Sequence, residues 1–245
     1  MNIIWRGQFC FQVLVSRGKN NQVNIIIDPF DETSGLKIPK LEGDILLVSH
    51  NKNKNLQEKL KMASTNPFLI SGPGEYEIKD VFVRGIYFGE KEVENTVYII
   101  EAEGLKLCHL GKLVQKNLTE EQIEKIGQVD ILTIPIGTRE GVSAKEALKI
   151  ITQIEPKITL PMYYLPDLPS ARLTSPTSEL AGGRATRKQA GQIPKLGPLA
   201  SGKLDGLDEF FKILGIKKPE PLNKLSIKKK DVSLNEAKIV ILKPS

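Results

Sequence analysis

The chain has 245 residues, of which 40% are hydrophobic and 26% charged, and it carries a formal net charge of +6. This composition is typical of a globular protein and excludes a wholly disordered chain. No apolar run approaches the roughly 18 residues that a transmembrane helix needs, and the alternating first residues are typical of a strand, not of a signal peptide. Cys10 and Cys108 are too few for a disulfide framework, so we expect free, buried thiols in the cytoplasm.

Most of the net charge lies in one stretch of the chain. Between residues 166 and 203, six basic residues stand against two acidic ones, together with five prolines, five glycines and no aromatic residue. Such a segment buries too little apolar surface to offset the entropy of ordering. We therefore predict a single domain over residues 1–245, interrupted by a disordered basic insertion at 166–203. We favour a solvated linker over a nucleic-acid-binding arm, because single-strand binding sites usually combine basic with aromatic residues.

The first half of the chain is predicted to consist of short strands separated by turn signals. The strands are expected at residues 3–5, 9–15, 23–27, 44–49, 68–71, 81–86, 96–101 and 105–110. A helix is expected at 55–62, and the Gly-Pro-Gly sequence at 72–74 predicts a sharp turn. The run at 44–49 is apolar throughout, which is typical of a strand buried on both faces.

The second half alternates helix and strand. Thr119 with Gln122, and Ser143 with Glu146, form capping-box patterns that predict helices at 119–126 and 143–154. Strands are expected at 131–135 and 158–161, followed after the insertion by a helix at 207–214 and a strand at 238–242. This order predicts a mixed α/β (α+β) domain in which helices cover β-sheets.

Seven segments, several at the ends of predicted strands, together resemble one known family. They are residues 5–11, 27–30, 44–50, 72–78, 108–111, 130–135 and 155–162. In this order they are similar to the metallo-β-lactamase-fold hydrolases, and most of all to bacterial metal-dependent hydrolases without an assigned substrate. The resemblance covers residues 1–165 and 204–243. It implies a four-layer αββα sandwich with a metal site at one edge between the sheets.

At the positions that the family uses for metal ligands, this sequence differs. The family's His-x-His-x-Asp-His motif corresponds to the stretch that begins at His50, and His50 alone keeps a ligand type there. A lysine replaces the bridging aspartate of the family's Gly-Asp step, and a tyrosine replaces its last histidine. The loop between residues 85 and 95 holds no histidine. The remnants of the ancestral metal site are His50, Lys52, Lys54, Asn55, Lys112 and Tyr163.

The replacing residues are poor metal ligands, and this determines which function we expect. A hydrolytic zinc site needs about three or four imidazole or carboxylate ligands and an open position for water, and a lysine ammonium is not a ligand near neutral pH. We therefore expect no bound metal and no catalytic residue. The predicted function is that of a hydrolase relative without catalysis, which binds a small anion or a protein partner at the old active-site edge. Lys52, Lys54 and Lys112 are the candidate anion-binding residues, and they could also neutralise nearby carboxylates.

Two alternatives stay open. In the first, the chain is an active metal-dependent hydrolase whose zinc is held by non-standard ligands, such as His50 with Asp28, Glu75 or Glu77. In the second, it binds nucleic acid through the basic insertion. The sequence places no serine or cysteine nucleophile beside His50, so we expect His50, and even more so His109, to be structural. No membrane association is expected.

Overall fold

The computed structural model describes residues 1–18, 21–30, 42–50, 66–89, 94–136, 142–163, 206–233 and 236–245. All of them belong to one compact unit, Met1–Tyr164 with Leu204–Ser245. The predicted helix at 55–62 and the predicted insertion at 166–203 lie outside these ranges. No helix of the described ranges is long and apolar enough to cross a membrane.

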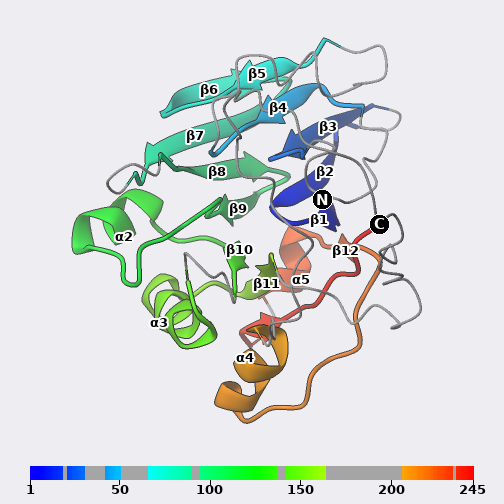
Figure 1. The fold of residues 1–245 in the computed structure, drawn as a ribbon. Coiled ribbons are helices and arrows are strands. Elements are labelled where there is room, and N and C mark those ends of the chain that lie inside the picture. Colours follow the sequence, from blue (N-terminus) through cyan, green and yellow to red (C-terminus); the bar gives the residue numbers. More distant parts are fainter. Residues whose placement is uncertain are drawn as a thin grey trace, which may run out of the picture. The chain divides into compact units, whose positions relative to one another are not determined.

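The described strands form two sheets (Figure 1). The first sheet has the order β12-β1-β2-β3-β4-β5. Its strands are β1 (Asn2–Gly7), β2 (Cys10–Ser16), β3 (Gln22–Ile27), β4 (Ile45–Leu47), β5 (Phe68–Ile70) and β12 (Leu225–Ser226). Strands β1 to β3 pair antiparallel, whereas β3, β4 and β5 run parallel.

The second sheet has the order β13-β11-β10-β9-β8-β7-β6. Its strands are β6 (Gly74–Ile78), β7 (Val81–Tyr87), β8 (Thr96–Ala102), β9 (Leu105–His109), β10 (Ile131–Pro135), β11 (Ile158–Met162) and β13 (Lys238–Ile239). Strands β6 to β9 pair antiparallel, and β9, β10, β11 and β13 run parallel. Every residue of β10 and β11 is buried, as expected of parallel strands covered on both faces.

Four described helices accompany the sheets: α2 (Glu120–Ile126), α3 (Ala144–Ile154), α4 (Gly206–Leu214) and α5 (Lys229–Ser233). Both predicted capping boxes are present: Thr119 caps α2 with Gln122, and Ser143 caps α3 with Glu146. Helix α4 packs against α3 (Figure 1). These observations confirm the predicted α/β class.

The inner faces of the two sheets share one hydrophobic core. Strands β1 and β2 alternate between buried and half-exposed positions, so one face of each strand points inward. Trp5 and Phe11 of the first sheet and Tyr98 of the second are almost fully buried in this core. Buried apolar side chains of α3 and α4 extend it on the outer face of the second sheet. The core therefore fixes the two sheets against each other, which matters for a site built from both.

Strand β6 was not predicted. Residues 72–74 were expected to form a turn between two strands, but the chain continues through β6 and turns at Lys79-Asp80, where both residues have positive φ angles of 52° and 60°. Glu75 and Glu77 of β6 are exposed, and this pattern of exposed charges at alternate positions is that of an edge strand.

Candidate functional site

The residues that follow strands β3, β4, β9 and β11 lie together at one end of the sheets, which we call the site end. Asp28 follows β3, Ser49 and His50 lie just beyond β4, Gly111 lies just beyond β9, and Tyr163 follows β11. In sheets with parallel strands, ligands usually bind outside the carboxyl ends of the strands. The site end is therefore the first place to look for function.

Asp28 is the centre of the site end. Its carboxylate accepts hydrogen bonds from the Ser49 backbone N–H at 2.6 Å, from the Ser49 hydroxyl at 2.5 Å and from His109 Nε2 at 2.9 Å. The side chain is almost completely buried, and its φ angle of 44° lies in the left-handed region. A buried carboxylate in this setting is tolerated because each of its oxygens has a donor.

Two histidines set the charge state of Asp28. Burial alone would raise the pKa of the carboxyl group, but the charge of His50 and the hydrogen bonds from His109 and His50 outweigh it and hold the pKa well below its usual range. Asp28 is therefore an anion at neutral pH. Among the described residues, the groups that lower its pKa are imidazoles, and Lys112, one of the three lysines that could neutralise nearby carboxylates, is not one of them.

His109 connects the two sheets through this anion. It is fully buried on β9 of the second sheet, whereas Asp28 belongs to the first sheet. Its Nε2 contacts Asp28, and its Nδ1 lies 2.8 Å from Thr133 Oγ1 on β10. The expectation that His109 is structural fits this position, but the sequence did not indicate that its partner is Asp28.

His50 is the site-end histidine that solvent reaches. Its Nδ1 lies 2.8 Å from Ser49 Oγ and 3.5 Å from Asp28 Oδ2, and its side chain is 20% exposed. Within the described part of the chain, Nε2 has no hydrogen-bonding partner. The ring packs edge-on against Phe9 at 4.9 Å, and Phe9 stacks on Tyr163 at 4.3 Å. Phe9 thus links the two predicted remnants His50 and Tyr163, and the sequence analysis missed both Phe9 and Ser49.

Gly111 and Asn95 hold the loops of the two sheets together. Gly111 has a φ angle of 58°, and a β-carbon there would overlap Ser49 Oγ and Asn95 Oδ1. Asn95 donates from Nδ2 to the Leu110 carbonyl at 2.9 Å, while its buried Oδ1 has no partner among the described atoms. The neighbouring N–H of Thr96 donates to the Ser49 carbonyl at 2.8 Å. The glycine is therefore required for close approach.

The remaining predicted site residues divide into two groups. Lys112 follows Gly111, is half-buried and forms no ion pair within the described residues. Lys52, Lys54 and Asn55 lie outside the described ranges, as does the insertion at 166–203, so anion binding by those two lysines and nucleic-acid binding by the insertion stay predictions. Glu75 and Glu77 are exposed on β6 and make no described contact with His50.

Among the described side chains of the site end, the Nε2 atom of His50 is suited to bind a metal ion. His50 Nε2 is free, whereas the Asp28 oxygens already accept three hydrogen bonds. No group of three or more His, Cys, Asp or Glu side chains that could hold a metal occurs within the described ranges. His50 thus fits a metal ligand, but the described residues do not complete a ligand set.

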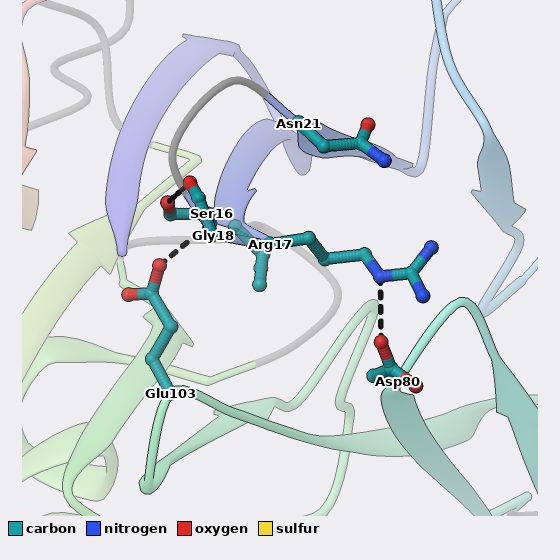
Figure 2. Close-up of a pocket in the computed structure, with 7 residues that line it drawn as sticks. Ser16, Arg17, Gly18, Asn21, Asp80 and Glu103 are labelled. Atoms are coloured by element: carbon teal, nitrogen blue, oxygen red, sulfur yellow. Dashed lines mark hydrogen bonds and ion pairs between the residues drawn. The ribbon is translucent and has the colours of Figure 1, made fainter.

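A pocket of about 390 Å³ lies at the opposite end of the sheets, called here the turn end. It is lined by residues 15–18 and Asn21, around the end of β2 and the start of β3, and by Asp80 and Glu103, which lie in the turns that follow β6 and β8. In Figure 2, Arg17 Nε contacts Asp80, and Glu103 accepts from the Ser16 backbone N–H. Glu103 also pairs with the amino group of Met1. These charges neutralise one another, so the pocket offers no reactive group.

Comparisons with known proteins agree with the fold. Residues 2–163 match the family described as a β-lactamase superfamily domain. A crystal structure of a candidate Zn-dependent hydrolase of the metallo-β-lactamase superfamily from Thermotoga maritima superposes with a TM-score of 0.69 at 25% identity, covering 98% of this chain and 97% of that one. The predicted sandwich fold is thereby confirmed.

Several related sequences are named metal-dependent hydrolases. A UPF0173 protein of Pyrococcus abyssi is 27% identical over 189 residues, covering 67% of this chain and 83% of the relative. A UPF0173 metal-dependent hydrolase of Thermococcus onnurineus is 24% identical over 212 residues, covering 73% of this chain and 91% of the relative. An Enterococcus faecalis relative with the same name is 22% identical, covering 67% of this chain and 86% of the relative.

These findings correct the functional expectation. From the sequence we expected a protein with no bound metal and no catalytic activity, because lysine, asparagine and tyrosine occupy the positions of the family's metal ligands. Several relatives that match two thirds of the chain or more are named metal-dependent hydrolases, and nothing in the described structure shows that a metal site has been lost. The prediction of a non-catalytic binding protein is therefore wrong, and the names point to a metal where none was expected.

Proposed function

The chain belongs to the β-lactamase superfamily, and from that membership we propose that it is a metal-dependent hydrolase with non-standard ligands that acts at the site end, with His50 as a metal ligand. The names of the relatives support the reaction class. The observation that carries the proposal is the orientation of His50, whose Nδ1 is held by Ser49 and Asp28 while Nε2 has no partner among the described residues.

The hydrogen bonds assign the protons of this group. Asp28 is ionised and lies 2.5 Å from Ser49 Oγ, so the single hydroxyl proton of Ser49 is donated to Asp28. Ser49 Oγ then accepts the proton on His50 Nδ1, 2.8 Å away. With this proton on Nδ1, the neutral form of His50 that binds a metal carries its lone pair on Nε2. Metal-binding histidines in proteins are typically oriented in this way, with the second ring nitrogen bonded to a carboxylate or another fixed acceptor.

A bound divalent metal would supply Lewis-acid activation of water or of the scissile bond. The chain's own residues contribute orientation: Asp28 and Ser49 fix the tautomer of His50, and Phe9 fixes its ring plane. Asp28 orients His50 through Ser49, and its oxygens accept three hydrogen bonds, two from Ser49 and one from His109.

We further propose a cytoplasmic location. Cys10 and Cys108 are both free and buried, which is typical of proteins from reducing compartments. Burial raises the pKa of both thiols, so neither is a nucleophile in the folded protein.

The test is metal binding by the untagged protein expressed with supplementary zinc and manganese. Mass spectrometry of the purified wild type is expected to find about one equivalent or more, and His50→Ala is expected to lose it. Ser49→Ala is expected to weaken metal affinity about 10–100-fold, because it removes the group that orients His50. Less than about a tenth of an equivalent in the wild type, or full retention by His50→Ala, would overturn the proposal.

A further inference from the structure

Lys112 differs from the other lysines of the described ranges. Three of these lysines are half-buried: Lys106, Lys112 and Lys218. Lys106 pairs with Glu101 at 2.9 Å and Lys218 pairs with Asp208 at 3.2 Å, whereas Lys112 has no ion-pair or hydrogen-bond partner within the described residues. A lysine whose ammonium group has no counter-ion of its own is available to bind an anion.

The backbone brings the residue before Lys112 against the residue before His50. Gly111, which precedes it, is packed so closely on Ser49 that no side chain fits between them, and Ser49 adjoins His50. Leu110 is tied to Asn95, and Leu113, on the other side of Lys112, is buried. The backbone on both sides of Lys112 is therefore fixed, and a flexible four-carbon stem carries the ammonium group from this fixed point.

The nearest buried carboxylate does not provide the missing partner. Both oxygens of Asp28 already accept hydrogen bonds from Ser49, and one of them also accepts from His109. Phe9 and Tyr163 add an aromatic wall beside His50 but no charge. Among the described residues, the positive charge of Lys112 is thus without a counter-charge.

We propose that Lys112 binds an anionic oxygen group of the substrate, a phosphate or a carboxylate, next to the His50 edge. The inference rests on the proposed hydrolase function and narrows it to substrates that carry such a group near the scissile bond. Lysine commonly binds these groups as a point charge. The substitution of lysine for the superfamily's acidic residue at this position then changes what the site end recognises.

The first experiment measures binding with inorganic phosphate and with acetate as probes, by calorimetric titration of the full chain. Lys112→Gln is compared with Lys149→Gln, which removes the same charge from an exposed lysine of α3. We expect Lys112→Gln to weaken binding of the preferred probe about tenfold or more, and Lys149→Gln to leave it unchanged. Stronger binding of phosphate would assign a phosphoryl substrate, and stronger binding of acetate a carboxylate substrate.

The second experiment separates this inference from the proposed function. With metal added, hydrolysis of anionic p-nitrophenyl phosphate is compared with hydrolysis of neutral p-nitrophenyl acetate. Lys112→Gln is expected to raise KM for the anionic ester alone, whereas His50→Ala abolishes both reactions. If the wild type hydrolyses neither ester but Lys112 still controls probe binding, the hydrolase proposal fails and the anion site stands. If neither probe binds, or both lysine variants lose binding equally, the inference about Lys112 is wrong.

Discussion

Charged groups lie at both ends of the two sheets, but in different surroundings. At the turn end, Arg17 and Asp80 form an ion pair with side chains that are 34% and 72% exposed. At the site end, His109 and Asp28 face each other with 0% and 2% exposure. A solvated pair costs little to form and contributes little, whereas a buried pair must offset a large desolvation penalty. Of these two pairs, only the one at the site end is buried on both sides, and its carboxylate orients His50.

The two ends also differ in where residues with positive φ angles occur. At the turn end, positive φ angles occur at Lys79, Asp80 and Glu103, in tight hairpin turns where such angles are normal. At the site end, Asp28 and Tyr163 have φ angles of 44° and 59° although each follows a parallel strand. Left-handed non-glycine residues outside turns are held by their surroundings and are common at functional sites. The site end thus combines buried charge with an unfavourable backbone.

The largest expected effect comes from removing the buried anion. Asp28→Ala leaves the Ser49 N–H, the Ser49 hydroxyl and His109 Nε2 without their acceptor, and should lower the free energy of unfolding by about 3–5 kcal/mol. Asp80→Ala removes the corresponding carboxylate at the turn end and should cost less than about 1 kcal/mol. Urea denaturation monitored by circular dichroism measures both. Equal losses in the two variants would remove the energetic difference between the ends.

The ionisation of Asp28 should also make the free energy of unfolding depend on pH. Because its pKa is lower in the folded than in the unfolded protein, Asp28 contributes its stability fully above the unfolded value of about 3.9, and loses it as the pH falls further. The difference in unfolding free energy between the wild type and Asp28→Asn should therefore shrink as the pH falls below about 4. Denaturation curves between pH 5 and pH 2 test this. A difference that stays the same over this range would contradict an ionised Asp28.

The third prediction concerns close packing at the site end. Gly111→Ala adds a methyl group that overlaps Ser49 and Asn95 at a positive φ angle, and should cost about 2–4 kcal/mol. Gly18→Ala also has a positive φ angle, of 75°, but no atom lies within 4 Å of the added carbon, so it should cost only about 1 kcal/mol. The difference between the two variants isolates the steric overlap, and equal costs would show that the loops separate freely.

Much of the fold could be predicted because its signals are local. The capping boxes of α2 and α3 involve residues three positions apart, and the apolar run of β10 is continuous. Strand β6 was missed because Gly74 was assigned to a turn, and because its exposed glutamates give no burial signal. Local patterns thus predicted the class, but not where the second sheet ends.

The site could be predicted only in part, because its contacts join distant segments. Asp28 and His109 are 81 residues apart and lie on different sheets. Each had a signal by itself, since Asp28 follows a strand and His109 precedes Leu110-Gly111, but nothing in the sequence joins them. Substitutions at ligand positions were visible in the sequence, yet they did not reveal that Ser49 and Asp28 still orient His50.

A smaller effect is expected at Thr133, the last residue of the buried hydrogen-bond series Asp28–His109–Thr133. Thr133→Val keeps the shape of the side chain but removes the partner of His109 Nδ1, and should cost about 1–3 kcal/mol. Thr152→Val makes the same change on the exposed face of α3, where the hydroxyl bonds to the Leu148 carbonyl, and should stay within about 0.5 kcal/mol. Thermal unfolding compares the two. If Thr133→Val is neutral, the buried network does not extend as far as β10.

The smallest effect is expected at the turn end, and there the salt dependence is the informative measurement. Arg17→Gln breaks the pair with Asp80, and because Asp80 is 72% exposed, the loss should be below about 1 kcal/mol at low salt. Mobile ions screen exposed charges over about 3 Å at 1 M salt, so the loss should disappear in 1 M NaCl. The cost of Asp28→Ala should persist there, because salt does not reach a buried carboxylate. If high salt reduced both costs alike, water would reach Asp28 as it reaches Asp80, and the orientation of His50 would need another explanation.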